Sequence, residues 1–186
     1  MTNLSNTNTD LARFPLGTAT RHGDEWVLRF VREYAHPLDR VWQSITDPER
    51  TKLWWAESRI DLRVGGRFDL RWLNGPDGQP LDWWPGEITA LDAPHLIEHT
   101  NIEHGRLRWE LERIDGGTRL TFTNTITPSE QRFVAMSLGG WHAHLDHLVE
   151  SIEGRAPDWA TWYDEFGAPW ELLRQQYRAA VPLAAD

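Results

Sequence analysis

The stretch SEQRFVAMSLGGWHAHLDHLVESI, residues 129–152, has the periodicity of one long amphipathic helix. At helical spacing its apolar residues fall on one face: Val134, Leu138, Trp141, Leu145, Leu148, Val149 and Ile152. His142 sits at the edge of that face, and Asp146 follows one turn later. Because this helix comes after a series of strands, we expect it to lie across the sheet that those strands form.

The residues before this helix predict a run of short antiparallel strands. A hairpin is expected to turn at His22-Gly23-Asp24, and its second strand carries Trp26, Leu28 and Phe30 on one face. Alternation or turn signals then predict strands over residues 68–72, 83–91, 95–102, 106–113 and 118–124.

Two short helices are expected between the first and second groups of strands. Pro37 opens one that runs through Ile45, and Asp47 caps a second that ends near Trp54 and Trp55. Strands and helices are therefore segregated rather than alternating, which favours the α+β class. The arrangement that fits this order best is a curved antiparallel sheet wrapped around the C-terminal helix.

Composition limits the partners of this chain. With 19 Lys and Arg against 28 Asp and Glu, the net charge is −9, which argues against nucleic acid or an anionic membrane surface. No apolar run approaches the ~20 residues of a membrane span, and no N-terminal signal pattern is present, so we expect a cytoplasmic protein. Zero cysteines exclude thiol chemistry, whereas twelve tryptophans supply much rigid ring surface.

Three regions are expected along the chain. Residues 1–12 are polar and predict a disordered tail, and residues 13–154 predict the sheet-and-helix domain. Residues 155–186 predict a helical extension that packs on the same domain as two short helices, interrupted at residues 167–169. A lid over a cavity and a dimer contact remain alternatives for this extension, and either a monomer or a homodimer is compatible with the sequence.

Several motifs carry a resemblance to a known family. They are Leu28-Arg29-Phe30, Val41-Trp42, Thr46-Asp47-Pro48, residues 61–68 with Gly65-Gly66, Gly86-Glu87-Ile88, Gly117-Thr118-Arg119-Leu120 and Gly140-Trp141-His142. In this order they resemble the homologues of the activator of heat-shock-protein ATPase, within the START-like helix-grip superfamily. The resemblance implies an elongated cavity between sheet and helix. Superfamily members include lipid and hormone binders, cyclases and a co-chaperone linked to the stress response.

Catalytic motifs are missing from the sequence. We find no nucleophile elbow, phosphate-binding loop or His-Glu metal motif. His142, His144 and His147 point in different directions on a helix, so we expect solvated histidines rather than a metal site, and we expect no cofactor. Glu87 and strand arginines such as Arg29, Arg71 and Arg108 are expected to face outward.

The sequence thus predicts that a small hydrophobic or aromatic ligand binds between the sheet and the long helix, without catalysis. The expected lining residues are Phe68, Leu70, Trp72, Trp84, Ile88, Trp109, Phe122, Met136, Trp141 and His142, with Trp54 and Trp55 near the mouth. Two alternatives stay open: an enzyme that uses His142 as acid or base in the same cavity, and a co-chaperone-like module that binds a chaperone partner through its exterior.

Overall fold

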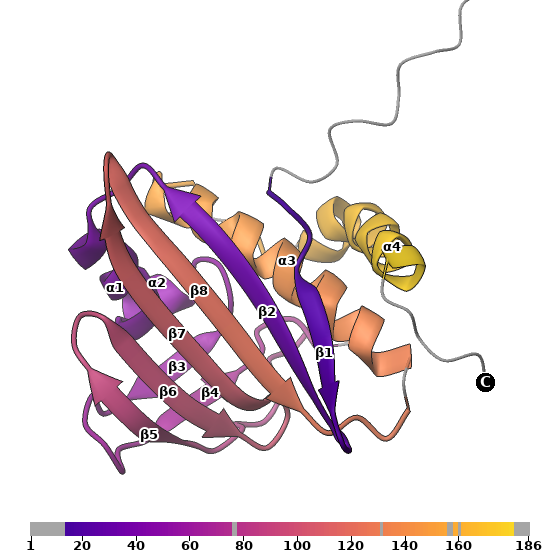
Figure 1. Ribbon diagram of the computed structural model, residues 1–186, viewed down its shortest axis with the longest axis horizontal. Helices are drawn as coiled ribbons and strands as arrows, with labels where there is room; N and C mark the ends of the chain where they lie inside the picture. The colour runs from indigo at the N-terminus through magenta and orange to yellow at the C-terminus, as the bar shows by residue number, and fades with distance from the viewer. Residues whose placement is uncertain (1–13, 76–77, 131, 156–157, 160, 181–186) are drawn as a thin grey trace, which may run out of the picture.

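A computed structural model describes residues 14–75, 78–130, 132–155, 158–159 and 161–180 (Figure 1). The predicted tail, residues 1–12, lies outside the described residues. The architecture is a large antiparallel sheet with a long helix along one face, and a second long helix packs on the first. The predicted α+β helix-grip fold is confirmed.

Six strands form the main sheet in the order β1-β2-β8-β7-β6-β5, and every neighbouring pair is antiparallel. Their bounds are β1 Thr18–His22, β2 Glu25–Tyr34, β5 Gly86–Asp92, β6 Leu96–Asn101, β7 Gly105–Ile114 and β8 Gly117–Ile126. The turn between β1 and β2 lies at Gly23, whose φ of 64° suits a glycine. Inward and outward residues alternate along β2 and β8, as the period of two predicts.

A smaller hairpin extends the curvature of the sheet. It consists of β3 (Glu57–Ile60) and β4 (Phe68–Arg71). Leu70 and Trp84 exchange backbone hydrogen bonds of 3.0 and 2.8 Å, which join β4 to the segment that leads into β5. The hairpin therefore continues the sheet beyond its edge and encloses the interior from a second side.

Two short helices, α1 (Leu38–Thr46) and α2 (Pro48–Thr51), follow β2 as expected. The Asp47 side chain accepts a 2.9 Å hydrogen bond from the backbone N–H of Glu49, which caps α2. The expected continuation of α2 to Trp54 and Trp55 is wrong, because the chain leaves the helix after Thr51 and turns. The backbone N–H groups of Trp54, Trp55 and Ala56 all donate to the Thr51 carbonyl, so the regular helical series of hydrogen bonds ends there.

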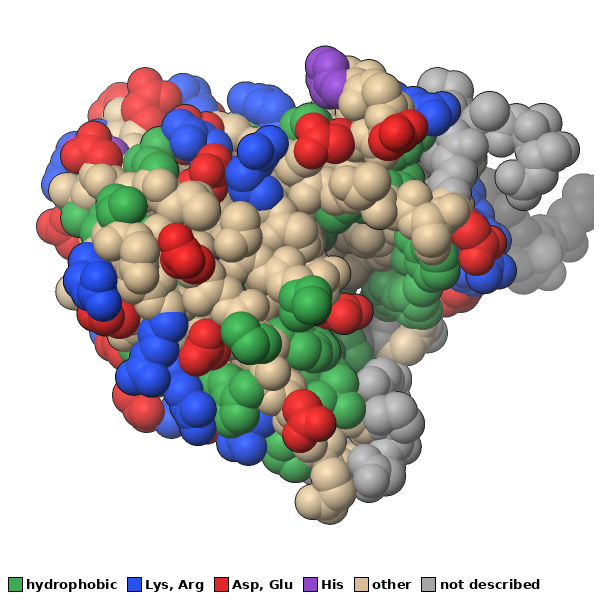
Figure 2. Space-filling model, turned by 90° about the horizontal axis from the view of Figure 1, so that it is seen from below, with side chains coloured by type: hydrophobic (Ala, Val, Ile, Leu, Met, Phe, Trp, Pro, Cys, Tyr) green, Lys and Arg blue, Asp and Glu red, His purple; other side chains and the backbone are tan. Residues whose placement is uncertain are grey.

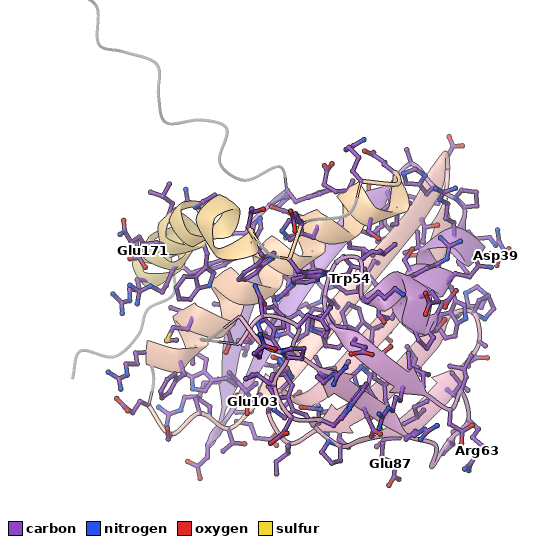
Figure 3. The ribbon with its side chains drawn as sticks, turned by 180° about the vertical axis from the view of Figure 1, so that it is seen from behind. Asp39, Trp54, Arg63, Glu87, Glu103 and Glu171 are labelled. Atoms are coloured by element: carbon purple, nitrogen blue, oxygen red, sulfur yellow. The ribbon has the colours of Figure 1, made fainter. Side chains whose placement is uncertain are left out.

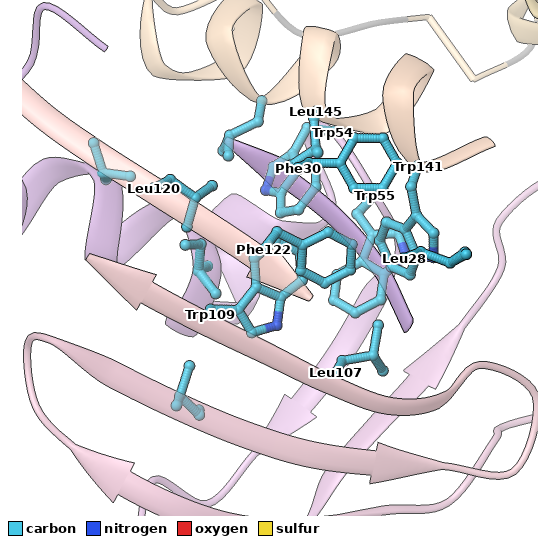
Figure 4. Packing of buried hydrophobic residues seen from close by; sticks show 14 of the residues in the cluster. Leu28, Phe30, Trp54, Trp55, Leu107, Trp109, Leu120, Phe122, Trp141 and Leu145 are labelled. Carbon is cyan, nitrogen blue, oxygen red and sulfur yellow. The ribbon is translucent and has the colours of Figure 1, made fainter. Parts of the chain in front are cut away.

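The long helix α3 spans Arg132–Ile152 and runs along one face of the sheet (Figures 1 and 3). The seven apolar residues that define its predicted face are all buried. Beneath it, aromatic rings fill the centre of the fold (Figure 4): the rings of Trp109 and Phe122 stack at 4.0 Å, and Trp141 packs on Phe122 at 4.5 Å. The core is therefore closely packed where α3 crosses the middle strands.

The C-terminal segment forms one helix, α4 (Trp162–Ala180), with Pro169 inside it. The expectation of two short helices is wrong. Pro169 removes one backbone donor and disfavours a helix locally, but Leu173 and Tyr177, further along the same helix, are buried. Packing of α4 on α3 thus outweighs the local preference of the Gly167–Pro169 segment.

Candidate functional site

A hollow opens between the first half of α3, the β4–β5 segment, the β6–β7 turn and α4. Its volume is about 510 Å³. A second hollow of about 670 Å³ adjoins it toward α4. Figure 2 shows an opening on the lower face that is bordered largely by hydrophobic side chains. The residues that line both hollows are Trp72, Glu103, Met136, Gly140, His144 and Trp170.

Five of the twelve predicted site residues line this space. They are Trp55, Trp72, Trp84, Met136 and Trp141. The other seven are Trp54, Phe68, Leu70, Ile88, Trp109, Phe122 and His142, and none of them lines either hollow. These seven are buried with at most 1% of their surface exposed: six belong to the packed centre beneath α3, and His142 lies in a separate buried cluster. The hollow lies to one side of the interior rather than along its whole length.

Trp54 is not at the mouth, where the sequence places it. Its indole N–H donates a 2.8 Å hydrogen bond to the Ser44 carbonyl, and its ring meets Trp109 edge-on at 6.0 Å. It therefore anchors the end of α1 to the core. Its neighbour Trp55 is also buried but borders the hollow, where its ring lies 5.3 Å from that of Trp141.

The aromatic walls meet at steep angles. Trp72 is nearly perpendicular to Trp162, at 5.3 Å and 86°, and to His144, at 5.1 Å and 88°. Across the first hollow, Trp84 and His104 are 5.4 Å apart at 68°. At these distances the rings pack edge-to-face on one another, and the hollow lies beside them.

Two histidines, His104 and His144, border the hollow, and their hydrogen bonds fix their tautomers. Nδ1 of His144 lies 3.1 Å from the Trp54 carbonyl, which can only accept, so Nδ1 carries the proton. Nδ1 of His104 lies 3.3 Å from Oδ1 of Asn101. That oxygen is an acceptor because Nδ2 of Asn101 donates to the Trp84 carbonyl at 3.1 Å. In both rings Nε2 is therefore an unprotonated acceptor.

Both imidazoles are neutral at pH 7. Burial, together with the nearby His144, lowers the pKa of His104 to about 4. Burial also lowers the pKa of His144 to about 4, although its bond to the Trp54 carbonyl opposes this shift. These two histidines therefore bring no positive charge to the hollow at neutral pH.

A glycine and an amide hold His104 in place. Gly105 has φ of 74°, and a Cβ there would lie 2.4 Å from the Thr125 carbonyl, so only glycine fits at this turn. Nδ2 of Asn124 donates to the His104 carbonyl at 2.6 Å. Oδ1 of Asn124 accepts the indole N–H of Trp141 at 2.9 Å, which joins the β6–β7 turn to α3.

His142 belongs to a separate, buried polar cluster on the other side of α3. Its Nδ1 lies 2.7 Å from the Tyr177 hydroxyl of α4, and its Nε2 lies 3.6 Å from Oδ2 of Asp146. The expected solvated histidines are wrong for His142 and His147, which are 0% and 7% exposed. The reason is that α4 and the rest of the fold cover the face of α3 that carries His142.

Arg32 completes this cluster and was not predicted from the sequence. It is 1% exposed, its Nη1 donates to the Pro15 and Val31 carbonyls at 3.0 Å, and its guanidinium lies 5.0 Å from the Phe14 ring. Burial lowers the pKa of this guanidinium, whereas the nearby Tyr34, Asp146 and Tyr177 act to raise it. Alternation offered a signal, since Arg32 continues the inward series that begins at Trp26.

His104 and Asn124 were also missed as lining residues. Asn124 follows Leu120 and Phe122 at the inward period of β8, so the pattern could have identified it. His104 lies in the turn between β6 and β7, where no periodicity applies. Glu87 is exposed, as expected.

Within the described ranges, no three His, Asp or Glu side chains are grouped so as to hold a metal ion. No helix in that part of the chain is long and apolar enough to cross a membrane.

The sequence is similar to that of one curated protein. A curated relative from Agrobacterium fabrum (strain C58 / ATCC 33970), described as "Probable malate:quinone oxidoreductase", is 34% identical over 137 residues, which are 66% of this chain and 25% of that protein. The chain thus spans a quarter of the length of this relative.

Solved structures share the fold. CalU16 from Micromonospora echinospora has a TM-score of 0.65 at 24% identity, with 83% of this chain and 88% of that chain covered. The conserved protein EF2215 from Enterococcus faecalis has a TM-score of 0.65 at 19% identity, covering 88% and 89% of the two chains. The family model described as "Activator of Hsp90 ATPase homolog 1-like protein" matches residues 35–153, well over half of the chain. The protein therefore belongs to the family of Activator of Hsp90 ATPase homolog 1-like proteins, with the START-like fold that the sequence predicted.

Proposed function

We propose that this protein binds a small, largely apolar or aromatic molecule in the hollow beside α3. The observation that carries the proposal is the space of about 510 Å³ bordered by four tryptophans from separate segments, Trp55, Trp72, Trp84 and Trp141, together with Trp170 of α4. Ligand sites in proteins have this size and this mixture of apolar walls with a few polar groups. The helix-grip fold is itself a ligand-binding fold.

The size of the available contact is compatible with useful affinity. A ligand that buries about 300 Å² of apolar surface gains roughly 7 kcal/mol by transfer from water, before the costs of association are subtracted. The polar groups at the hollow, chiefly His104, His144 and Glu103, then orient the ligand.

The alternative of an enzyme with His142 as acid or base lacks the required geometry. His142 does not line either hollow, and its Nδ1 is engaged by the Tyr177 hydroxyl. A general acid or base must come within hydrogen-bond reach of the bound substrate. The co-chaperone alternative stays a prediction from the family resemblance, and it requires stimulation of a chaperone ATPase by the purified chain.

The experiment uses N-phenyl-1-naphthylamine, a neutral aromatic dye whose emission rises in apolar sites. We expect saturable binding that Trp84→Ala weakens at least about tenfold, the loss of roughly 1.4 kcal/mol of ring contact. Trp83→Ala is the matched control, because Trp83 is also half-buried but lies under the guanidinium groups of Arg59 and Arg71, at 3.8 and 4.9 Å. Equal binding by wild type and Trp84→Ala, or no saturable binding at all, would refute the proposal.

A further inference from the structure

We infer that the ligand of this hollow is an organic cation: an aromatic or apolar body that carries a protonated amine. The inference rests on the proposed function, since it names the chemical class that the same site accepts. It follows from the charges and lone pairs that border the space, which are all of the kind that attract positive charge.

The first observation concerns the ring faces. Trp72 is nearly perpendicular to His144 and to Trp162, whose rings are themselves within 19° of parallel at 6.1 Å, and Trp84 borders the first hollow. The face of an indole is the negative end of its quadrupole and attracts ammonium groups within about 6 Å of the ring centre. Several faces that surround one space are the usual arrangement for holding an ammonium group.

The second observation concerns the polar atoms. His104 and His144 each carry their proton on Nδ1, where it bonds to the protein, so each leaves Nε2 as a hydrogen-bond acceptor. No hydrogen bond to either Nε2 is formed within the described part of the chain. An ammonium group has N–H donors and no acceptor, and it therefore complements these nitrogens, whereas a carboxylate does not.

The third observation concerns charge. Among the described residues, no lysine or arginine lines either hollow, while Glu103 lines both and Glu171 lines the second. Glu171 is already compensated, because Arg174 donates to its two oxygens at 2.7 and 2.8 Å. Glu103 forms no ion pair with the described residues, and it is an exposed residue. Figure 3 shows Glu103 below α3, Glu171 on α4 and Glu87 at the outer margin of the sheet.

The net charge of −9 acts in the same direction over longer distances, since it raises the local concentration of cations and repels anions. An anionic ligand would have to leave water for a site without a positive partner, which is costly. A cation finds ring faces, two lone pairs and one carboxylate.

The test is calorimetric titration of the full chain with three molecules of similar size: 2-phenylethylammonium, 2-phenylethanol and 3-phenylpropanoate. We expect the ammonium compound to bind about tenfold or more tightly than the alcohol, as ring–cation attraction and one ion pair predict. The carboxylate should not bind. Glu103→Gln should weaken binding of the ammonium compound about three- to tenfold and leave the affinity for the alcohol unchanged. Glu87→Gln, which removes an equal charge from the exposed face of β5, should have no effect.

The outcomes separate the two proposals. If the alcohol or the carboxylate binds as well as the ammonium compound, or if none of the three binds while the naphthylamine dye does, the cation inference is overturned and the proposed function stands. If neither the dye nor any of the three binds, both fail. Equal loss of ammonium binding in Glu103→Gln and Glu87→Gln would mean that only the overall charge matters, and it would overturn the assignment to this site.

Discussion

The Tyr177 hydroxyl stands between His142 Nδ1 and the backbone N–H of Gly17, 2.7 Å from each. Because the N–H of Gly17 can only donate, the hydroxyl accepts from it and gives its own proton to His142 Nδ1. One oxygen thereby connects α4, α3 and the segment that precedes β1. Burial raises the pKa of Tyr177 to about 12 and lowers that of His142 to about 3, so both groups remain neutral over the physiological range.

Removal of the Tyr177 hydroxyl should destabilise the fold without changing ligand binding in the hollow. Tyr177→Phe leaves a partly buried N–H and a buried ring nitrogen without partners, each at a cost of about 1–3 kcal/mol. We expect the free energy of unfolding in urea to fall by about 2–4 kcal/mol, with dye affinity unchanged. A double-mutant cycle with His142→Leu measures the coupling, and additive effects of the two changes would show that the hydrogen bond contributes nothing.

Stability should fall steeply below neutral pH. Burial lowers the pKa of His99 and His142 to about 3, and that of His104, His144 and His147 to about 4. Since these folded-state values lie below the ordinary value near 6.5, the unfolded chain binds more protons between about pH 4 and 6.5. The stabilisation is therefore complete above pH 6.5, and it is lost as the pH falls toward 4 for His104, His144 and His147 and toward 3 for His99 and His142.

Each such histidine contributes up to about 1.4 kcal/mol per pH unit within that window. Urea unfolding at pH 7.5, 6.0 and 5.0 measures the slope. His99→Gln should reduce the slope of the free energy of unfolding against pH, because it removes one of the buried groups that titrate. The His99 ring is held inside the fold: its Nε2 accepts the Trp109 indole N–H at 3.2 Å, and the ring stacks on Phe68 at 3.8 Å. The exposed His22 supplies the control variant His22→Gln. A free energy of unfolding that stays constant from pH 7.5 to 5.0 would contradict the burial of these rings.

The sequence predicted the frame of this protein better than its site. Period-two and period-3.6 patterns identify the strands and α3 because burial of one face is a local, repeating constraint. The position of the hollow depends instead on which side chains from distant segments fill the interior. Trp109 and Phe122 stack on each other and fill the core, whereas Trp72 and Trp84 border the hollow. No spacing rule distinguishes these two pairs.

The local sequence pattern also could not predict that α4 is one continuous helix. Gly167 and Pro169 predict a break, and only the burial of Leu173 and Tyr177 explains why the helix continues. Gly139 lies where the two helices meet, since a Cβ there would be in ordinary van der Waals contact, at 3.4 Å, with the Arg174 backbone nitrogen. Such a match between a small residue on one helix and the backbone of another appears only once both helices are placed.

Two histidines on α3 offer a direct comparison of site and scaffold. His144 lines both hollows, whereas His142 faces Tyr177, although they are two residues apart. His144→Gln should weaken binding of the naphthylamine dye about two- to tenfold, the value of one hydrogen bond near 0.5–1.4 kcal/mol. His142→Gln should lower stability and leave dye affinity within about twofold. The reverse order of effects would show that the ligand contacts the His142 side of α3.

Trp141 serves core and hollow together, so its replacement should affect both stability and binding. It is 4% exposed, its N–H bonds Asn124 Oδ1 at 2.9 Å, and it borders the hollow beside Trp55. Trp141→Ala should cost about 3–5 kcal/mol in unfolding free energy, as large-to-small core changes do. Trp141→Phe retains most of the ring but loses the hydrogen bond, and should cost about 1–3 kcal/mol. Because Asn124 also holds the His104 carbonyl at 2.6 Å, we expect this variant to bind the dye more weakly as the β6–β7 turn loosens. Full stability together with unchanged dye affinity in Trp141→Phe would mean that the Trp141–Asn124 bond supports neither the core nor the hollow.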